Sequence, residues 1–230
     1  MFNYYGSKSK IVDYYPPPKF NRIIEPFAGS ARYSLKYFEN DILIVDKFKT
    51  ITDIWDFLKN ASEKDIYGLP KFKQGDNLND FGLSDIEITF LQYITQHGTV
   101  GGYKVSEWGA RDLQRTIKNI ANNLFKIRHW EIKNCDYNEL ENENATWFID
   151  PPYQFGGHKY KCSNKFIDFN YLSEWCKTRN GQSIVCENTK ADWLPFKPMI
   201  DMTGIMFKTT EAIWSNHATN YDFVQTSLFS

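Results

Sequence analysis

The tetrapeptide Asp150-Pro151-Pro152-Tyr153 places a carboxylate, two prolines and an aromatic ring directly after a short apolar run, residues 147–149. An exocyclic amino group on adenine or cytosine is a poor nucleophile, because its lone pair is delocalised into the ring. If Asp150 accepts one N–H of such an amine and the carbonyl of Pro151 accepts the other, the nitrogen becomes more electron-rich and can attack an activated methyl group. Tyr153 is then expected to stack on the base.

The same four residues also fit a strand end followed by a proline-stiffened turn that carries no chemistry. A base inside a duplex is not accessible to a pocket of this kind, so the target nucleotide would have to be flipped out or already unpaired. The choice between the two interpretations depends on the other elements of the chain.

The apolar runs predict strands of a parallel sheet that end in functional residues. Residues 22–27 form one such run, which stops at the small residues 28–30, and a helical pattern follows over residues 31–39. Residues 42–46 form a second run that ends in Asp46. A strand, turn, helix and strand with an acid about 20 positions on is typical of nucleotide-like cofactor sites, so Asp46 is expected to accept ribose hydroxyls. An ordinary βαβ crossover would give the same pattern.

Strand signals largely disappear between residues 50 and 133, where helical patterns prevail. Residues 50–60 read as one helix, Ser84 with Glu87 makes a capping box for another, and residues 111–128 predict an amphipathic helix. Residues 104–133 hold seven Lys or Arg against three acids. The side chains expected to meet nucleic-acid phosphates are Lys104, Arg111, Arg115, Lys118 and Lys126. The alternative is the ordinary solvated face of a helix.

Strands resume at residues 147–149 and 183–188, and residues 206–208 with 211–216 predict a hairpin added to the sheet. Residues 154–165 are polar and contain glycine. They are a candidate mobile flap beside the site, or only a loop.

The composition limits the class of protein. The 230 residues can fill one sizeable domain, or a domain with a modest insertion. A net charge of −1 argues against coating nucleic acid by bulk electrostatics. No signal peptide or membrane span is recognised, so a cytoplasmic protein with no membrane partner is expected. No metal site is expected, and the cysteines expected to be reduced thiols are Cys135, Cys162, Cys176 and Cys186.

Four motifs in this order resemble the Dam-type DNA adenine methyltransferases, and their joint occurrence is far more specific than any one of them. The motifs are Tyr4-Tyr5-Gly6-Ser7-Lys8, Glu25-Pro26-Phe27-Ala28-Gly29-Ser30, Asp136-Tyr137 and Asp150-Pro151-Pro152-Tyr153. The resemblance implies an α/β fold, a Rossmann-like S-adenosylmethionine-dependent methyltransferase with a mixed sheet flanked by helices. It also implies a mainly helical target-recognition insertion at residues 60–133, between the two parts of the catalytic domain, residues 1–59 and 134–230.

The resemblance also implies a role for each motif. S-adenosylmethionine would be the cofactor and S-adenosylhomocysteine the product, with Asp136 accepting from the cofactor adenine and Tyr137 packing on it. The amides of residues 27–29 would face its methionine end, over which Lys8 closes. The implied cofactor-binding residues are Tyr5, Gly6, Lys8, Glu25, Pro26, Phe27, Ala28, Gly29, Ser30, Asp46, Asp136, Tyr137 and Asp150, and the implied catalytic residues are Asp150, Pro151, Pro152 and Tyr153. One departure is Ala31, where the family has glycine.

The implied activity is methyl transfer to adenine N6 in double-stranded DNA, with base flipping, by a monomer in the cytoplasm of a bacterium or of a phage-infected host. An RNA adenine-N6 methyltransferase and a non-catalytic nucleic-acid-binding relic of the fold remain alternatives, and cytosine N4 is a less favoured target. Restriction-modification, repair marking and anti-restriction are all compatible roles. Gln225, Leu228 and Phe229 resemble a peptide that docks on the replication sliding clamp, although the same residues fit a final edge strand.

Overall fold

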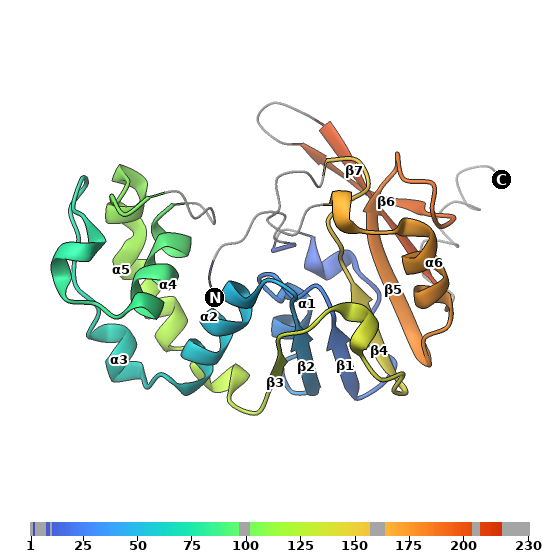
Figure 1. Cartoon of the computed structure of the whole chain (residues 1–230), viewed down its shortest axis with the longest axis horizontal. Helices are drawn as coiled ribbons and strands as arrows, with labels where there is room; N and C mark the ends of the chain where they lie inside the picture. The colour runs from blue at the N-terminus through green and yellow to red at the C-terminus, as the bar shows by residue number, and fades with distance from the viewer. Residues whose placement is uncertain are drawn as a thin grey trace.

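Strands and helices alternate along the chain in the computed structural model (Figure 1), which describes residues 2, 8–9, 11–96, 102–156, 164–203 and 208–217. The strands are β1 (Arg22–Glu25), β2 (Asp41–Val45), β3 (Glu131–Lys133), β4 (Ala145–Ile149), β5 (Gly181–Asn188), β6 (Lys197–Thr203) and β7 (Lys208–Ser215). The α-helices are α1 (Arg32–Lys36), α2 (Lys49–Asn60), α3 (Glu63–Tyr67), α4 (Asp85–Thr95), α5 (Glu107–Ala121) and α6 (Phe169–Lys177). Short 3₁₀ helices are η1 (Val12–Tyr14), η2 (Leu78–Phe81), η3 (Leu124–Ile127), η4 (Tyr137–Glu139) and η6 (Asn164–Phe166).

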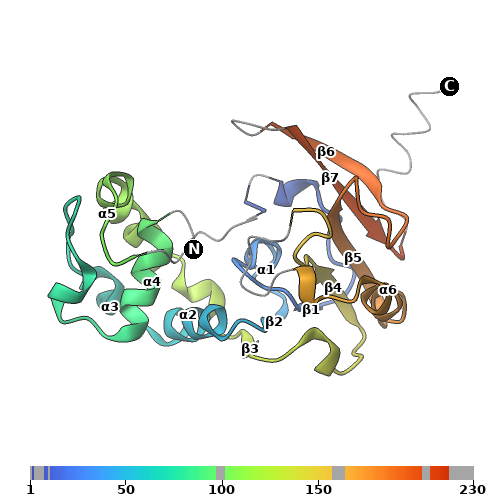
Figure 2. The ribbon, with the colours of Figure 1, turned by 45° about the horizontal axis from the view of Figure 1, so that its top comes forward.

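The strands form one sheet in the order β3-β2-β1-β4-β5-β7-β6. Strands β1 to β5 run parallel, and β7 runs antiparallel to both β5 and β6. The strand order reverses between β1 and β4, which is where doubly wound sheets bind ligands outside the carboxyl ends of their strands. This mixed, mainly parallel sheet flanked by helices confirms the predicted Rossmann-like α/β fold class. The β7–β6 hairpin extends the sheet beyond β5 (Figure 2).

The two faces of the sheet carry separate hydrophobic clusters, because successive side chains of a strand point to opposite faces. In β2, Ile42 and Ile44 face one cluster while Leu43 and Val45 face the other. The first cluster contains the buried side chains of α1, α2, α4 and α5, and the second contains those of α6. Such a strand reads as a continuous apolar run, which is why β2 was recognisable from sequence.

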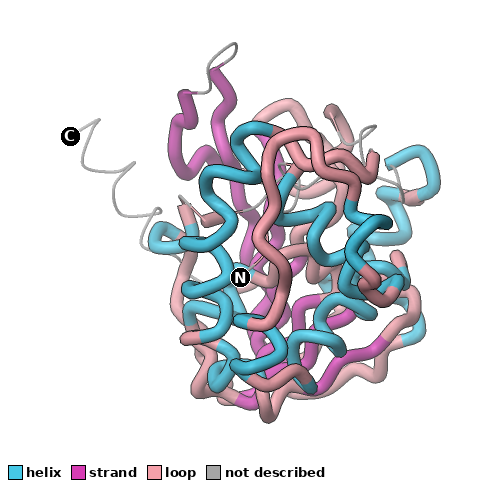
Figure 3. The backbone as a smooth tube through the Cα atoms, turned by 90° about the vertical axis from the view of Figure 1, so that its left-hand side faces the viewer, coloured by secondary structure: helices cyan, strands magenta, loops and turns pink. Residues whose placement is uncertain are grey.

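The helices between β2 and β3 gather at one end of the molecule, away from α6 (Figure 1), and in the end-on view they lie in front of the strands (Figure 3). The capping box of Ser84 and Glu87 begins α4 as predicted. The α5 helix ends at Ala121, although the sequence predicted a helix to Arg128. Its apolar spacing continues because η3 buries Leu124 and Ile127 against the same core.

Two strands differ from the sequence expectation. Strand β3, which pairs with β2 at the sheet edge, was missed because it has three residues and no fully buried side chain. The described strand that pairs with β7 in the hairpin is Lys197–Thr203, whereas Lys208 begins β7 itself and residues 206–207 lie outside the described residues. The division of the chain into catalytic and recognition parts stays a prediction, although β3 shows that residues 131–133 belong to the sheet.

Within the described residues, no helix is both long and apolar enough to cross a bilayer. Cys135, Cys176 and Cys186 are free thiols, and Cys162 lies outside the described residues.

Candidate active site

Every parallel strand of the sheet ends in, or is closely followed by, an acidic residue. These acids are Glu25 for β1, Asp46 for β2, Asp136 for β3, Asp150 for β4 and Glu187 for β5. Because parallel strands present their carboxyl ends at one edge, the five acids follow that edge across the reversal of strand order between β1 and β4. The structure therefore places Asp46, Asp136 and Asp150 on the same edge of the sheet.

The turn after β1 is fastened to Asp46. The Gly29 N–H donates to Asp46 Oδ2 at 3.0 Å, and the Phe48 N–H donates to Oδ1 at 2.8 Å. The Ala28 N–H donates to the Val45 carbonyl at 2.9 Å. The amides of Ala28 and Gly29, which were expected to face a cofactor, therefore both donate within the protein, and their role in cofactor binding stays a prediction. Burial raises the pKa of Asp46 to about 6, against the effect of these two backbone bonds.

The turn needs a left-handed backbone at two positions. Gly29 has φ +46°, which costs glycine nothing, but Ala31 has φ +43°. A left-handed alanine costs about 1–2 kcal/mol. The position where the family has glycine therefore does require the conformation that glycine favours, and the buried methyl group of Ala31 packs in the core instead.

Glu25 fixes the start of α1 rather than facing the edge. Its Oε2 accepts from the Ser34 hydroxyl at 2.6 Å and from the Ser34 N–H at 3.2 Å, and the residue is only 3% exposed. Burial raises the pKa of Glu25 to about 8, although the bonds from Ser34 oppose that shift. Glu25 is thus mainly protonated at pH 7.

The Glu25→Gln variant should resist alkaline pH better than the wild type. The folded pKa of about 8 lies above the ordinary value of 4.5, so the stabilisation is complete below pH 4.5 and is lost as the pH rises through 8. Between pH 6 and pH 9 the wild type should lose about 2–4 kcal/mol more than the variant. Urea unfolding at both pH values measures this difference, and parallel losses in the two proteins would contradict the buried acid.

An aromatic surface lies beside Asp136. The rings of Phe27 and Tyr137 have centroids 5.2 Å apart, and Trp175 meets Tyr137 edge-on at 5.2 Å. Asp136 Oδ2 lies 2.6 Å from the ammonium of Lys47, the residue after Asp46. A flat apolar surface next to a carboxylate can receive an aminopurine, whose ring stacks while its amino group donates. The structure thus brings together three residues of the predicted cofactor site.

Asp150 belongs to a buried polar cluster. The Lys8 ammonium lies 3.1 Å from Asp150 Oδ1 and 3.1 Å from Glu211 Oε1, and it also donates to the Tyr153 hydroxyl. The same ammonium lies 4.4 Å from the centroid of the Tyr153 ring. The Lys8 side chain is 9% exposed, so it is not an ordinary solvated lysine.

Opposing effects act on the Asp150 carboxyl. Burial raises its pKa to about 6, the positive charge of Lys8 lowers it and the negative charge of Glu211 raises it. At pH 7 the carboxylate is therefore mostly ionised and able to accept hydrogen bonds. Its side chain is 20% exposed, so an amino group can approach it from outside.

Sequence reasoning missed two further acids of the site. Glu187 accepts from the Gln154 and Asn188 N–H groups and from the Trp193 indole, and so fixes the turn after Tyr153. Glu211 of β7, near the C-terminal end of the chain, forms an ion pair with Lys8 and accepts a hydrogen bond from the Tyr153 hydroxyl. The sequence signal that could have found both residues is an acid within an apolar strand. Burying a carboxylate is costly unless it is paired, so such an acid indicates a functional or structural partner.

Some of the predicted residues lie outside the described part of the chain, and the predicted phosphate contacts lie on its surface. Tyr5, Gly6, Gln225, Leu228 and Phe229 lie outside the described residues, as do residues 157–163 of the candidate flap. The predicted phosphate contacts are described and lie on the surface. Arg111 and Arg115 pair with Asp112, at 3.2 and 3.0 Å, while Lys104 and Lys118 are exposed. Lys126 lies 5.0 Å from the ring centroid of Phe38.

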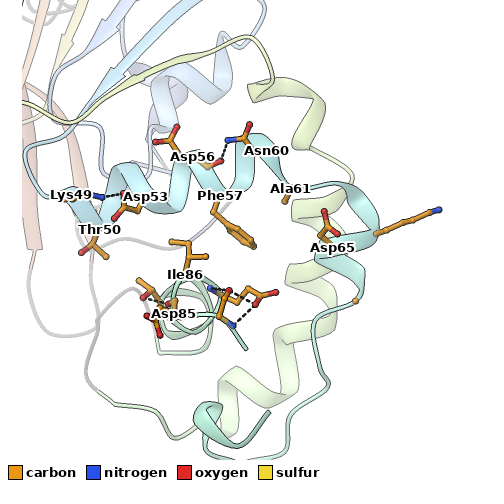
Figure 4. A pocket seen from close by; sticks show the side chains of 15 residues that line it. Lys49, Thr50, Asp53, Asp56, Phe57, Asn60, Ala61, Asp65, Asp85 and Ile86 are labelled. Atoms are coloured by element: carbon orange, nitrogen blue, oxygen red, sulfur yellow. Dashed lines mark hydrogen bonds and ion pairs between the residues drawn. The ribbon is translucent and has the colours of Figure 1, made fainter. Parts of the chain in front are cut away.

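An open groove of about 970 Å³ lies among α2, α3 and α4 (Figure 4). Its lining residues include five acids, Asp53, Asp56, Asp65, Asp85 and Glu87, against Lys49 and Lys64. Such a lining disfavours a phosphate backbone. Among the described residues, no group of three or more His, Cys, Asp or Glu side chains is arranged to hold a metal ion.

Comparisons with known proteins find only distant structural similarity between this chain and solved structures. No protein-family model and no curated protein sequence matches the chain. "Putative methyltransferase yhhF" from Escherichia coli is 8% identical, with a TM-score of 0.39, 92% of this chain covered and 81% of that chain. "Putative methylase HI0767" from Haemophilus influenzae is 11% identical, with a TM-score of 0.37 and coverages of 86% and 80%. A "conserved hypothetical protein" from Streptococcus pyogenes is 12% identical, with a TM-score of 0.34 and coverages of 90% and 92%.

Proposed function

We propose that the acidic edge of the sheet is the active site of an S-adenosylmethionine-dependent methyltransferase that acts on adenine N6 in DNA. The observation that carries the proposal is the cluster of Lys8, Asp150 and Tyr153 at the end of β4. It lies next to the reversal of strand order, on the same edge as Asp46 and the Phe27–Tyr137 pair.

The residues present fit this cofactor. Phe27 and Tyr137 offer ring faces for its adenine, and Asp136 offers an acceptor for its amino group. Asp46 lies one strand away and accepts two backbone N–H groups through different oxygens, each of which retains a lone pair for a ribose hydroxyl. When bound, S-adenosylmethionine supplies an electrophilic methyl group on its sulfonium.

Asp150 would do two things for the acceptor. As a carboxylate it accepts an N–H of the target amine, which draws the nitrogen toward a tetrahedral, more nucleophilic form. It can also take the proton that the nitrogen releases after transfer, because a pKa of about 6 suits a base near neutral pH. The Pro151 carbonyl is the proposed second acceptor, and Tyr153 the proposed stacking surface.

Two observations favour a non-catalytic relic as the second candidate. The Ala28 and Gly29 amides bond within the protein, and Lys8 already donates to Asp150. A relic would bind nucleic acid or a partner but would transfer no methyl group.

A transfer assay separates the candidates. Purified protein and S-adenosylmethionine labelled in its methyl group are incubated with duplex DNA, single-stranded DNA and RNA of mixed sequence. The proposal expects label in adenine of DNA above that in RNA. Label confined to RNA would transfer the assignment to an RNA enzyme, and background counts on every substrate would favour the relic.

We also propose that the helical segment of residues 60–133 is a target-recognition insertion. The exposed basic side chains of α5 would contact the DNA phosphates. The affinity for DNA should then fall as the salt concentration rises, because each neutralised phosphate releases counterions. The paired Arg111 and Arg115 should contribute less than Lys118, since their charges are already partly neutralised by Asp112.

A further inference from the structure

Glu211 of β7, which the sequence reasoning left without a role, lies at the centre of the cluster around Asp150. Its side chain is 0% exposed. Its Oε1 accepts from the Tyr15 hydroxyl at 2.6 Å and from the Tyr153 hydroxyl, and lies 3.1 Å from the Lys8 ammonium. One oxygen therefore gathers donors from the region before β1, from the turn after β4 and from the N-terminal segment.

Packing alone does not account for this carboxylate. The other oxygen, Oε2, is buried and has no hydrogen-bond partner among the residues that the structure describes. A buried carboxylate costs several kcal/mol unless a counter-charge and hydrogen bonds compensate it. Strand pairing holds it in place, because Glu211 lies opposite Asn188 of β5 and Ile200 of β6.

The Lys8 ammonium is shared between two carboxylates at equal distances, 3.1 Å from Asp150 Oδ1 and 3.1 Å from Glu211 Oε1. An ammonium is an N–H donor, as is the amino group of a base. On Asp150 it therefore makes the same kind of hydrogen bond that an incoming amino group would have to make. For the amino group to bind, the ammonium must give up that contact while keeping a counter-charge.

We propose that Glu211 is a positioning residue that keeps Lys8 paired while Asp150 exchanges the ammonium for the target amino group. The inference rests on the proposed function. Glu211 touches neither acceptor nor cofactor in this account. It acts through Lys8 and through the Tyr153 hydroxyl, which donates to the same carboxylate oxygen.

The proposal predicts opposite effects from removing one charge or two. In Glu211→Gln, Lys8 loses one of the two carboxylates that share its ammonium, so the ammonium competes more strongly with the amino group for Asp150 and kcat should fall about 10- to 100-fold. In the double variant Lys8→Met/Glu211→Gln the ammonium that competes for Asp150 is gone. Its kcat should recover at least about tenfold over that of Glu211→Gln.

Two further variants separate charge from packing. Tyr15→Phe removes one hydrogen bond to the same oxygen of Glu211 but leaves the carboxylate, so it should lose far less activity than Glu211→Gln. Lys8→Met alone leaves two carboxylates without their cation, which raises the pKa of Asp150 and makes transfer depend on alkaline pH. Affinity for S-adenosylmethionine, measured by calorimetry, should stay within about threefold in Glu211→Gln.

A readout that needs no turnover is the titration of Asp150, followed by the carbon NMR signal of its carboxyl group and assigned with Asp150→Asn. The groups that face or influence Asp150 are Lys8, Tyr15, Glu25, Tyr153, Cys186, Glu187 and Glu211. In Glu211→Gln the midpoint should move to lower pH, because a negative neighbour is gone while Lys8 remains.

The outcomes are distinguishable from failure of the proposed function. A wild-type protein that transfers no methyl group to any nucleic acid refutes that function, and with it the inference. An active wild type whose double variant is no better than Glu211→Gln refutes the positioning role alone. An unmoved Asp150 titration in Glu211→Gln would do the same, since it would show that the charge of Glu211 does not act on Asp150.

Discussion

Asp150→Asn is expected to lower kcat for methyl transfer by about 1000-fold or more, within the range that a positioned base contributes together with charge stabilisation. Asparagine keeps the shape of the side chain but carries no negative charge, cannot take the released proton and offers one acceptor oxygen instead of two. Lys8 retains a counter-ion in this variant through Glu211. The fold should therefore survive, and kcat should report the lost chemistry.

The measurement is steady-state transfer under saturating cofactor and DNA, with cofactor affinity measured separately by calorimetry. Asp53→Asn is the matched control, because it makes the same change to a partly exposed aspartate on α2 that pairs only with Lys49 among the ion pairs of the described chain. The control should keep wild-type activity. Asp150→Asn with more than about a tenth of wild-type kcat would show that another group acts on the amine.

Gly181→Ala should have the largest effect on folding. Gly181 begins β5 at φ +92°, and a Cβ atom there would lie 2.2 Å from the carbonyl oxygen and 2.9 Å from the nitrogen of Ala145 in β4. Neither strand can yield, because β4 is buried between β1 and β5. The strain and the displaced strand pair should cost about 3–5 kcal/mol of unfolding free energy, or prevent soluble expression.

Gly102→Ala is the control for this change. Its Cβ atom would meet nothing within 4 Å, and its φ is not in the left-handed region. Urea unfolding should place this control within about 0.5 kcal/mol of wild type. A Gly181→Ala protein equally stable would mean that the two strands are not in register at their starts.

The sheet was predictable from sequence where its strands are buried on both faces. Runs such as residues 42–46 and 147–149 carry consecutive apolar residues followed by an acid, and both acids lie at the carboxyl edge. β3 could not be found this way, since an edge strand of three residues leaves no apolar run. The end of α5 was misplaced because η3 continues the same inward-facing spacing after the helix has ended.

The site was predictable only in its motifs. Asp150 and Tyr153 were recognisable because adjacent residues carry the signal. The cluster that they form with Lys8 and Glu211 joins segments from opposite ends of the chain, so local spacing holds no trace of it. The hydrogen bond from Gly29 to Asp46 was not predicted either. Both residues were predicted as ligand contacts, whereas the structure pairs them with each other.

The most direct test of the central claim is mass spectrometry of nucleosides from the DNA of cells that express this chain, compared with cells that express Asp150→Asn. Host adenine methyltransferases are deleted in both. The account predicts N6-methyladenine in DNA with the wild-type chain and background levels with the variant. Equal background levels in both, from a wild-type protein that is folded and abundant, would contradict it.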